Sequence, residues 1–433
     1  MAGLLKKNGA RVFVSDRAPL AKLEQAKREL DALAIPAEFG ENSLRVLDAD
    51  VVVVSPGVPS TAPLVREAIA RGRMVVSEVE VASWFCPAPI VAVTGTNGKT
   101  TTVTLLGRIF TDAKRPSMVG GNIGLAFSQI VGELTADGTA ILEISSFQLD
   151  HIATFRPRVS VLLNITPDHL DRYDRSFENY IASKCRVFEN QRSGDTLIYN
   201  EDDEVARVAV QGRADPAVTL LPFSRERELA QGAFLRGNRL MIARNGTMVE
   251  VVEADAISIR GAHNLLNAMA AALTAHVMGI PTASIRATLR NFKGVEHRLE
   301  FVRELHGIVY VNDSKATNVD SVWYALQSFR QPLVLLLGGR DKGNDYARIR
   351  ELVREHVRAI IAIGESAEKV RLAFAETVPV SVCGTMEEAV QTARRRAQQG
   401  DVVLLSPACA SFDWFENFEH RGRAFKELVN DLT

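Results

Sequence analysis

The amino-acid sequence predicts an α/β protein of three domains. Its 433 residues exceed what one ordinary hydrophobic core holds, which favours several domains. Short β-rich runs alternate with helical patterns over most of the chain, as in layered folds with parallel sheets. The breaker at Pro87-Ala88-Pro89 and the end of the second region near Gly294 give domains of residues 1–87, 88–294 and 295–433.

Charge and composition exclude several classes of protein. Lys and Arg number 51 against 52 Asp and Glu, so no overall basic field points to nucleic acid or an anionic membrane as partner. The four cysteines have no paired spacing, which predicts buried thiols in a reducing compartment, without a disulfide framework or a metal site. The apolar runs are too short for a membrane span, and no signal peptide opens the chain. We therefore expect a cytoplasmic monomer.

The outer regions carry the strands of two further sheets. In the first region, β-rich runs occur at Ala10–Ser15, Asp50–Val54 and Met74–Val76, without a convincing catalytic cluster. In the third region, four apolar runs lie far enough apart for a crossover helix between successive strands, which predicts a parallel sheet. These runs are Ile308–Val311, Leu333–Leu337, Ile360–Ile363 and Val402–Leu405.

The second region opens with the parts of an anion site. Ile90–Val93 is a buried type of strand, Gly95–Gly98 a flexible turn, and Lys99 begins a helix. Backbone N–H groups and the positive helix end would face a phosphate, with the Lys99 ammonium beside them and the Thr100 hydroxyl offered to Mg²⁺. The turn departs from the standard G-x-x-x-x-G-K-[ST] loop, because Val93 stands where the first glycine should be. The alternative is a Gly-Asn turn before an ordinary helix, but the following Lys-Thr-Thr favours a nucleotide-phosphate site.

Acidic and histidine side chains follow two further strands of this region. Glu143 closes one apolar strand, and Asp168, His169 and Asp171 follow the strand Val159–Leu163. Ligands of parallel sheets gather at the carboxyl ends of the strands, so these side chains are candidates for metal and phosphate chemistry. A lone histidine is more often structural, yet a place at a strand exit beside two acids favours a functional role for His169.

Seven motifs in one order resemble the Mur ligases of peptidoglycan synthesis, and they cover nearly all of the chain. They are TGTNGKTTT (94–102), EISSFQLD (143–150), NITPDHLDRY (164–173), HNLLNAMAA (263–271), HRLE (297–300), NDSKATN (312–318) and LSPACASFDWFENFEHRG (405–422). In this family the loop places its first glycine as here. The resemblance implies a Rossmann-like UDP-binding domain, a central P-loop ATPase domain and a C-terminal Rossmann-like domain, which match the three regions.

Within the family, the C-terminal block resembles that of the members that add D-glutamate. The D-D/N-P-[RA] signature of lysine-adding and diaminopimelate-adding members does not occur in residues 401–433. The implied reaction joins D-glutamate to UDP-N-acetylmuramoyl-L-alanine through an acyl phosphate formed with ATP. Because a carboxylate and a triphosphate are both anionic, this chemistry depends on positioning and on neutralisation of their charges by cations.

The resemblance also implies roles for residues around ATP. Lys99, His169 and Lys184 would form the catalytic set, and Lys184 would carry a carbamate that binds metal. Thr100 and Glu143 would hold one Mg²⁺, and His169 would contribute to a second. Taken alone, Lys184 reads as a solvent-exposed lysine on a helix, so its role rests on the resemblance. Further ATP contacts are implied for Gly95, Thr96, Asn97, Gly98, Thr101, Asn264, Asn267, Arg298 and Asp313.

The other substrates have implied contacts as well. Asn122, in GGNIG, resembles a contact to the muramoyl group, and Asp16 and Arg17 match the position of uracil-side contacts. Hydroxyl, backbone N–H and ammonium groups would hold the two carboxylates of the amino acid. The residues implied are Lys315, Thr317, Lys342, Ser411, Phe412 and Phe418. We also expect Phe412 and Phe418 to pack in the core.

The N-terminus departs from the family pattern. In the family the chain opens with a strand and a glycine-rich turn that face the UDP diphosphate. Here it begins at MAGLLKKNGARVFVSD, which reads as the later part of the first helix followed by the second strand. We therefore expect Met1 to be an internal start, the N-terminal sheet to lack its first strand, and UDP-substrate binding to be weak.

Two other functions fit parts of the sequence. A folylpolyglutamate synthetase would share the loop, the carbamylated lysine and the ligase chemistry. It normally lacks a UDP-binding N-terminal domain, and the SPACAS block argues against it. A nucleotide-binding protein inactive as a ligase would result if the missing N-terminal turn abolished substrate binding, and it would turn over ATP independently of any amino acid.

Overall fold

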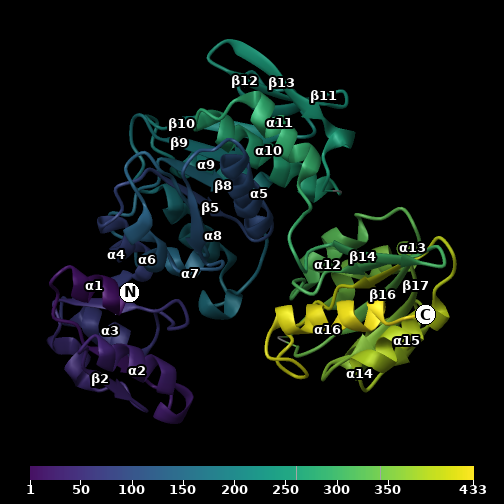
Figure 1. Cartoon of the computed structure of the whole chain (residues 1–433), viewed down its shortest axis with the longest axis horizontal. Helices are drawn as coiled ribbons and strands as arrows, with labels where there is room; N and C mark the ends of the chain where they lie inside the picture. Colours follow the sequence, from purple (N-terminus) through teal and green to yellow (C-terminus); the bar gives the residue numbers. More distant parts are fainter. Residues whose placement is uncertain (260, 342) are drawn as a thin grey trace. The chain divides into compact units, whose positions relative to one another are not determined.

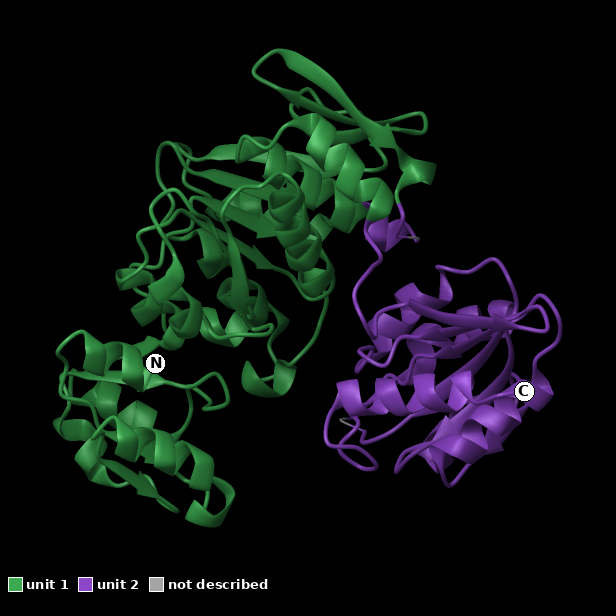
Figure 2. Cartoon of the chain, in the orientation of Figure 1, with its two compact units in different colours: residues 1–257, 266–291 green, residues 258–265, 292–433 purple. Residues whose placement is uncertain are grey.

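The computed structural model describes residues 1–259, 261–341 and 343–433, which fall into two compact units (Figure 2). Unit 1 comprises residues 1–257 and 266–291, and unit 2 comprises residues 258–265 and 292–433. Both sides of the break at Pro87-Ala88-Pro89 belong to unit 1, so the division of this part into two domains stays a proposal. None of the described helices is long and apolar enough to cross a membrane.

Residues 1–87 contain two separate two-stranded parallel sheets (Figure 1). The sequence predicts one sheet that lacks a strand, and the structure instead pairs β1 with β2 and β3 with β4. The strands are β1 (Val14–Asp16), β2 (Ala37–Phe39), β3 (Val51–Val54) and β4 (Met74–Ser77). The helices are α1 (Ala2–Lys7), α2 (Glu24–Ala32), α3 (Pro63–Ala70) and α4 (Glu78–Trp84). The predicted helix before the first strand is thus present.

A nine-stranded sheet of order β13-β12-β11-β10-β9-β8-β5-β7-β6 forms the rest of unit 1. The strands from β5 to β11 pair in parallel, and β12 and β13 continue the sheet in antiparallel fashion. The strands are β5 (Ile90–Thr94), β6 (Met118–Gly121), β7 (Ala140–Glu143), β8 (Val159–Leu162), β9 (Thr196–Asn200), β10 (Thr219–Ser224), β11 (Gly232–Arg236), β12 (Arg239–Arg244) and β13 (Thr247–Glu253). The hairpin β12–β13 is not predicted from the sequence.

The central strands of this sheet are buried along their whole length. All residues of β5, β7 and β8 are buried, as expected of parallel strands covered on both faces. The covering helices are α5 (Lys99–Asp112), α6 (Phe127–Ile130), α7 (Ser146–Leu149), α8 (Phe177–Cys185), α9 (Glu204–Arg213), α10 (Ala262–Val277) and α11 (Thr282–Asn291). Because β5 lies between β7 and β8, the loops after these three strands meet at one edge.

Unit 2 is built on a six-stranded sheet of order β14-β15-β19-β16-β17-β18 in its described residues. The four predicted strands pair in parallel, which confirms the expected parallel sheet, and β14 adds an antiparallel edge. The strands are β14 (Glu300–Leu305), β15 (Ile308–Asn312), β16 (Leu333–Gly338), β17 (Val357–Ile363), β18 (Val380–Val382) and β19 (Val402–Leu405). The helices are α12 (Val319–Leu326), α13 (Arg350–His356), α14 (Ala367–Phe374), α15 (Met386–Arg396) and α16 (Phe418–Asn430).

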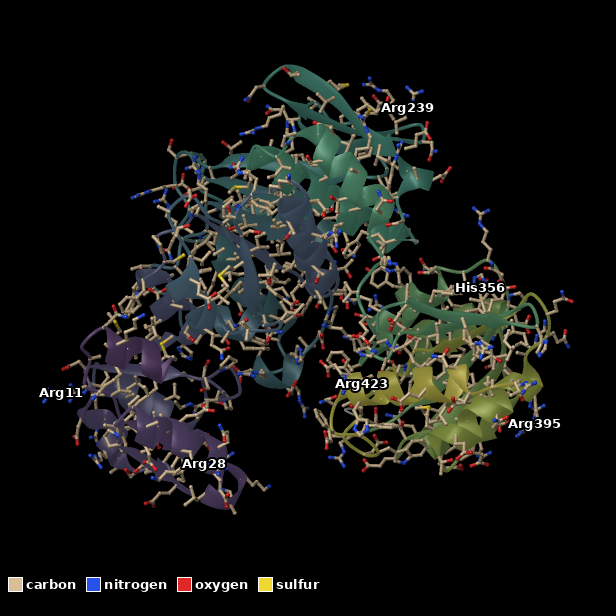
Figure 3. The ribbon with its side chains drawn as sticks, viewed as in Figure 1. Arg11, Arg28, Arg239, His356, Arg395 and Arg423 are labelled. Carbon is tan, nitrogen blue, oxygen red and sulfur yellow. The ribbon has the colours of Figure 1, made fainter. Side chains whose placement is uncertain are left out.

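Three of the four cysteines follow the sequence expectation of buried thiols. All four cysteines are free thiols, three of them buried and Cys86 partly exposed. Exposed arginines occur on both units, for example Arg28, Arg239 and Arg395, whose side chains point outward in Figure 3.

Candidate functional site

The turn between β5 and α5 depends on two glycines. Gly95 and Gly98 have φ angles of 152° and 88°, which side-chain-bearing residues rarely adopt. A Cβ atom on Gly95 would lie 2.9 Å from the Cβ of Leu163, and one on Gly98 would lie 2.2 Å from Oδ1 of Asn267. The turn is therefore pressed against the loop after β8 and against helix α10, and only glycine fits at both positions.

The loop after β8 holds the turn through paired hydrogen bonds. The backbone N–H of Asn97 donates to Oδ1 of Asn164 at 2.8 Å, and Nδ2 of Asn164 donates to the Asn97 carbonyl at 3.0 Å. The hydroxyl of Thr96 donates to the Thr166 carbonyl and accepts from its N–H, both at 3.0 Å. Sequence reasoning did not select Asn164 or Thr166, although both lie in the NITPDHLDRY motif. Their role becomes visible only when β5 and β8 are placed side by side.

Two lysines converge on one carbonyl of the turn. Nζ of Lys99 lies 2.8 Å and Nζ of Lys184 lies 2.9 Å from the carbonyl oxygen of Gly95. Lys184 is only 2% exposed, and its Nζ lies 4.6 Å from the centre of the Tyr180 ring. The interpretation of Lys184 alone as a solvent-exposed lysine is therefore wrong, because α8 directs it inward.

Burial of Lys184 changes its acid–base behaviour. Loss of hydration lowers the pKa of Lys184 well below its usual value, and the Lys99 ammonium lowers it further. The Asp168 carboxylate opposes this by raising the pKa. A buried amine with a lowered pKa spends more of its time neutral, and a neutral amine is a nucleophile.

Thr100, Glu143 and Asn122 meet beside the turn, at the carboxyl end of β7. The Thr100 hydroxyl donates to Oε2 of Glu143 at 2.8 Å, and Nδ2 of Asn122 lies 3.2 Å from Oε1. The backbone N–H of Asn122 also donates to the Glu143 carbonyl at 2.8 Å. Glu143 is 3% exposed, so its carboxylate and the Thr100 hydroxyl are held together away from solvent. Both offer oxygen atoms, the kind of ligand that Mg²⁺ prefers. The structure thus brings Thr100 and Glu143, implied together as ligands of one Mg²⁺, close to Asn122, implied as a contact of the muramoyl group.

His169 lies in the loop after β8 with a strained backbone. Its φ angle is 51°, an uncommon conformation for a non-glycine residue. Its N–H donates to Oδ1 of Asp168 at 2.9 Å, and its ring meets the edge of Phe147 at 6.4 Å between centroids. The imidazole is 46% exposed and so accessible to a ligand.

Further predicted residues lie on α10, whose first residues up to Leu265 belong to unit 2, and at the end of β1. Asn264 and Asn267 are both buried on α10, one turn apart, and Asn267 contacts the turn at Gly98. Asp16 and Arg17 are exposed at the end of β1, where Oδ1 of Asp16 accepts the N–H of Ala18 at 2.7 Å. Their use in substrate binding stays a prediction.

A cavity of about 580 Å³ is lined in part by residues of α8. Ser60, Asp150 and Arg186 line it, and none of the residues predicted from the sequence does. Its arginines are occupied, since Arg186 donates to the carbonyls of Asp150 and Ile152. The chemistry of the loop therefore lies outside this cavity.

In unit 2, the loop after β15 carries a buried carboxyl group. Asp313 is 4% exposed; the Ser406 hydroxyl donates to its Oδ2 at 2.8 Å, and the N–H of Leu299 donates to its Oδ1 at 3.2 Å. Burial raises the pKa of Asp313 to about 7, although the Arg298 guanidinium and the Ser406 hydrogen bond lower it. Arg298 itself is partly exposed in the preceding segment.

The residues predicted to hold the amino acid lie around the loops that follow β15 and β19. Nζ of Lys315 lies 5.1 Å from the centre of the Phe418 ring, and Ser411 is buried. Thr317 is partly exposed on the same loop as Lys315. Phe412 is 58% exposed, so the expectation that it packs in the core is wrong. Lys342 lies outside the described residues.

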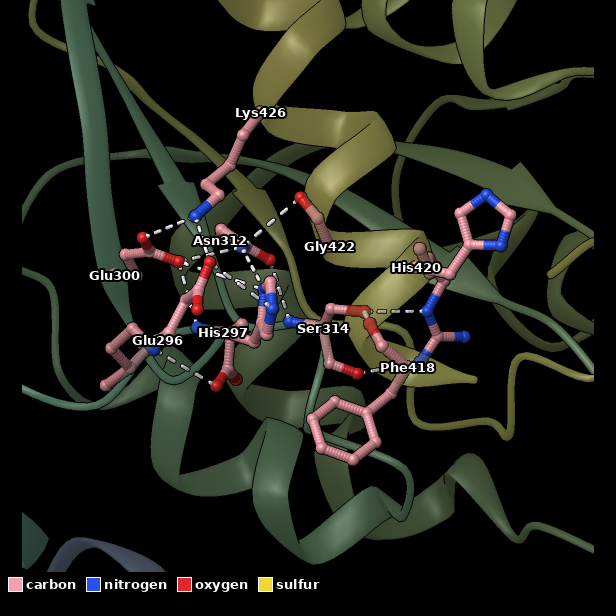
Figure 4. A network of polar contacts seen from close by, with 12 residues as sticks. Glu296, His297, Glu300, Asn312, Ser314, Phe418, His420, Gly422 and Lys426 are labelled. Atoms are coloured by element: carbon pink, nitrogen blue, oxygen red, sulfur yellow. Dashed lines mark hydrogen bonds and ion pairs between the residues drawn. The ribbon is translucent and has the colours of Figure 1, made fainter. Parts of the chain in front are cut away.

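An ion-pair network lies behind these loops (Figure 4). Glu296, His297 and Glu300 offer ligand atoms within 4.8 Å of one another, as a metal site would. However, Nζ of Lys426 lies 2.6 Å from Glu296 and 2.9 Å from Glu300, and so already pairs with both carboxylates where a metal ion would bind. Nδ1 of His297 lies 2.9 Å from Nδ2 of Asn312, which places the proton of the neutral ring on Nε2 and argues against metal ligation there.

The fold is that of an α/β protein with a glycine turn between a buried parallel strand and a helix, and comparison with known proteins extends this. Residues 93–275 match the family model described as Mur ligase middle domain, and residues 297–409 match that of the Mur ligase, glutamate ligase domain. The UDP-N-acetylmuramoylalanine–D-glutamate ligase of Salinibacter ruber is 49% identical, over 100% of this chain and 95% of that protein. The protein of the same name from Pelotomaculum thermopropionicum is 44% identical over 99% of this chain and 94% of that protein. The chain belongs to the Mur ligase family.

Solved structures show the same fold at low sequence identity. A pseudomurein peptide ligase type C from Methanothermus fervidus has a TM-score of 0.63 at 18% identity, covering 100% of this chain and 97% of that one. A UDP-N-acetylmuramate–alanine ligase from Thermotoga maritima has a TM-score of 0.60 at 17% identity, covering 97% and 99%. The α/β layers built on parallel sheets are therefore those of known peptide ligases.

Replacing Gly98 by alanine should weaken the binding of ATP. The new Cβ would overlap Oδ1 of Asn267 at 2.2 Å, so the turn has to move away from α10. We expect ATP affinity, measured by calorimetry, to fall at least about tenfold, because backbone strain of this kind is worth on the order of 1–3 kcal/mol. Gly246→Ala is the matched control: its φ is also positive, at 74°, but nothing lies within 4 Å of its Cβ. Wild-type affinity in Gly98→Ala would contradict the proposed role of the turn.

Replacing Asp313 by asparagine should stabilise unit 2 at alkaline pH. The carboxyl pKa is about 7 in the folded chain and about 3.9 when unfolded, so the folded state binds more protons in this window and loses stability as pH rises through it. Asp313→Asn removes that loss, which is worth up to about 4 kcal/mol above pH 7 and nothing below about pH 4. Thermal unfolding at pH 4 and pH 8 measures the difference. Equal stability of the two proteins at pH 8 would show that the carboxyl is not strained by burial.

Proposed function

We propose that the chain is an ATP-dependent ligase that adds D-glutamate to UDP-N-acetylmuramoyl-L-alanine. The observation that carries the proposal is the convergence of Lys99 and Lys184 on one carbonyl, beside the Thr100–Glu143 pair. Cations and magnesium-type ligands at one strand edge suit a reaction between a triphosphate and a carboxylate, which repel each other in water. The names of the relatives supply the two substrates.

The proposed reaction has two steps. The carboxylate of the L-alanyl group attacks the γ-phosphorus of ATP, which gives an acyl phosphate and ADP. The amine of D-glutamate then attacks the acyl carbon, and the C–O bond to phosphate breaks, which gives an amide and inorganic phosphate. Lys99 and the N–H groups of the turn hold the phosphates and stabilise the charge that moves onto them. Asn122 would orient the muramoyl substrate, and its hydrogen bond to Glu143 supports this role.

The donor set beside the turn fits magnesium. Thr100 and Glu143 would hold one ion with their hydroxyl and carboxylate oxygens, and His169 and a carbamate on Lys184 would contribute to a second. Bound Mg²⁺ neutralises phosphate charge and orients the phosphates. The Thr100–Glu143 hydrogen bond keeps both oxygens in place, and half-exposed His169 keeps its ring accessible.

In the same scheme, Lys184 becomes carbamylated by CO₂. The ammonium group first loses one proton; the neutral amine then attacks CO₂, a C–N bond forms as a C=O π bond opens, and a second proton leaves the nitrogen, so that a cation has become an anion. This exchange also removes the repulsion between the two ammonium groups on the Gly95 carbonyl. The lowered pKa of Lys184 supports the proposal, because an ammonium group has no lone pair for the attack.

Phosphate release from ATP tests the ligase assignment. With UDP-N-acetylmuramoyl-L-alanine present, we expect release that requires D-glutamate and is absent with L-glutamate, meso-diaminopimelate or L-lysine. Calorimetry with ATP alone serves as the control that the protein is competent. Release that is independent of the amino acid would contradict the proposal and favour a nucleotide-binding protein. Release with a folate substrate and glutamate would favour a folylpolyglutamate synthetase.

The carbamate is tested with labelled bicarbonate. Protein equilibrated with ¹³C-bicarbonate at pH 8 should show a carbamate carbon by NMR, and Lys184→Arg should lose both the signal and the ligase activity. Lys426→Arg is the control. Ion pairs with Glu296 and Glu300 raise the pKa of Lys426 against the effect of burial, so Lys426 stays an ammonium group and carries no label. The Lys426→Arg protein should therefore keep the carbamate signal. A signal that survives in Lys184→Arg would rule out this assignment.

A further inference from the structure

Arg421, on the first turn of α16, is a buried cation without a carboxylate partner. It is 1% exposed, although its guanidinium group is among the most strongly polar of side chains. Nε donates to the Ser314 hydroxyl at 2.9 Å, Nη2 to the Ser314 carbonyl at 2.7 Å and Nη1 to the Cys409 carbonyl at 3.1 Å. Among the described residues, no carboxylate oxygen lies within the 4.0 Å of an ion pair.

Keeping this charge inside the protein is costly. An unpaired charge in the interior loses its hydration without the compensation of an ion pair. Burial lowers the pKa of Arg421 to about 10, so the side chain remains protonated at neutral pH. A neutral side chain of similar volume would fill the space at a lower cost in folding free energy. Packing alone therefore does not explain an arginine at this position.

The guanidinium group ties together three loops of the sheet. Ser314 follows β15, and Cys409 follows β19. Gly339, after β16, packs so closely that a Cβ there would lie 3.2 Å from Nη1 of Arg421. The carboxyl ends of these three neighbouring strands therefore meet around one side chain.

The same three loops carry the residues predicted to hold the amino acid. Lys315 is the neighbour of Ser314, and Ser411 lies two positions beyond Cys409. The Ser314 hydroxyl also donates to the Phe418 carbonyl at 2.8 Å, which links the loop to the start of α16. A displacement of the guanidinium group would thus shift a predicted ammonium and a predicted hydroxyl contact together.

We propose that Arg421 is a positioning and specificity-determining residue for the incoming amino acid. Its fork of donors fixes the spacing between the Lys315 loop and the Ser411 loop. Its charge, which the nearby Asp413 and Asp313 carboxyl groups offset only in part, favours an amino acid with two carboxylates over one with a neutral side chain. Arg421 does not touch the substrate, since its side chain is buried. The inference rests on the proposed amino-acid site.

Two substitutions separate the effect of the planar hydrogen-bonding geometry of Arg421 from the effect of its positive charge. Arg421→Lys keeps the charge but loses the planar fork, and Arg421→Met loses both. We expect the KM for D-glutamate to rise about tenfold in Arg421→Lys and about a hundredfold in Arg421→Met, with the KM for ATP unchanged within a factor of about two. Arg303→Met is the control, because Arg303 also donates to carbonyls at the other end of α16, those of Val429, Asn430 and Leu432.

A milder variant keeps the test decisive if Arg421→Met does not fold. Ser314→Ala removes the partner of Nε and should raise the KM for D-glutamate a few-fold, again without an effect on the KM for ATP.

Ser411→Ala tests the proposed amino-acid site itself. If Ser411→Ala raises the KM for D-glutamate and Arg421→Lys and Ser314→Ala do not, the role of Arg421 is wrong and the site stands. If Ser411→Ala has no effect, the proposed site is wrong. A uniform rise of every KM in the Arg421 variants would indicate a merely structural role and overturn the inference.

Discussion

The meeting of two lysine side chains at the carbonyl of Gly95 is the contact on which the rest of unit 1 depends. Two ammonium groups within 3 Å of one oxygen repel each other, and the protein tolerates this only if one amine is neutral or anions arrive. The arrangement requires a turn that presents its carbonyl inward, which in turn requires glycine at 95 and 98. Helix α8 has to bring Lys184 into the interior. The proposed phosphate site thus depends on β5, β8, α8 and α10 together.

Both units place ionisable groups where burial is unfavourable. Examples are Lys184 and Glu143 in unit 1 and Asp313 and Arg421 in unit 2, each at most 4% exposed. Hydrophobic residues at such positions would be better for stability, so their presence fits chemistry in which charges have to be exchanged. All four lie at or near the carboxyl ends of parallel strands or on helices packed against them, where backbone groups can replace water. In both units, buried ionisable groups therefore lie near the carboxyl ends of the parallel strands.

The elements with strong local signals could be predicted from the sequence. The buried strands β5, β7, β8, β15, β16 and β19 read as apolar runs, and the glycine turn with its lysine is local in the chain. Lys184 could not be placed, because the side of α8 that faces inward depends on β5, far away in sequence. Sequence reasoning did not select Arg421, whose contacts with Ser314 and Cys409 appear only in the folded chain. Phe412 carries an apolar side chain that the fold leaves exposed, and no sequence pattern distinguishes it from Phe425, which is fully buried.

The central claim is that the site activates a carboxylate by transferring phosphate to it. The direct measurement uses UDP-N-acetylmuramoyl-L-alanine labelled with ¹⁸O in its terminal carboxylate, and mass spectrometry of the phosphate released with D-glutamate. Attack of that carboxylate on ATP moves one carboxylate oxygen into the acyl phosphate linkage, so the account predicts one ¹⁸O atom in the inorganic phosphate. Unlabelled phosphate, formed together with the amide product, would contradict the account.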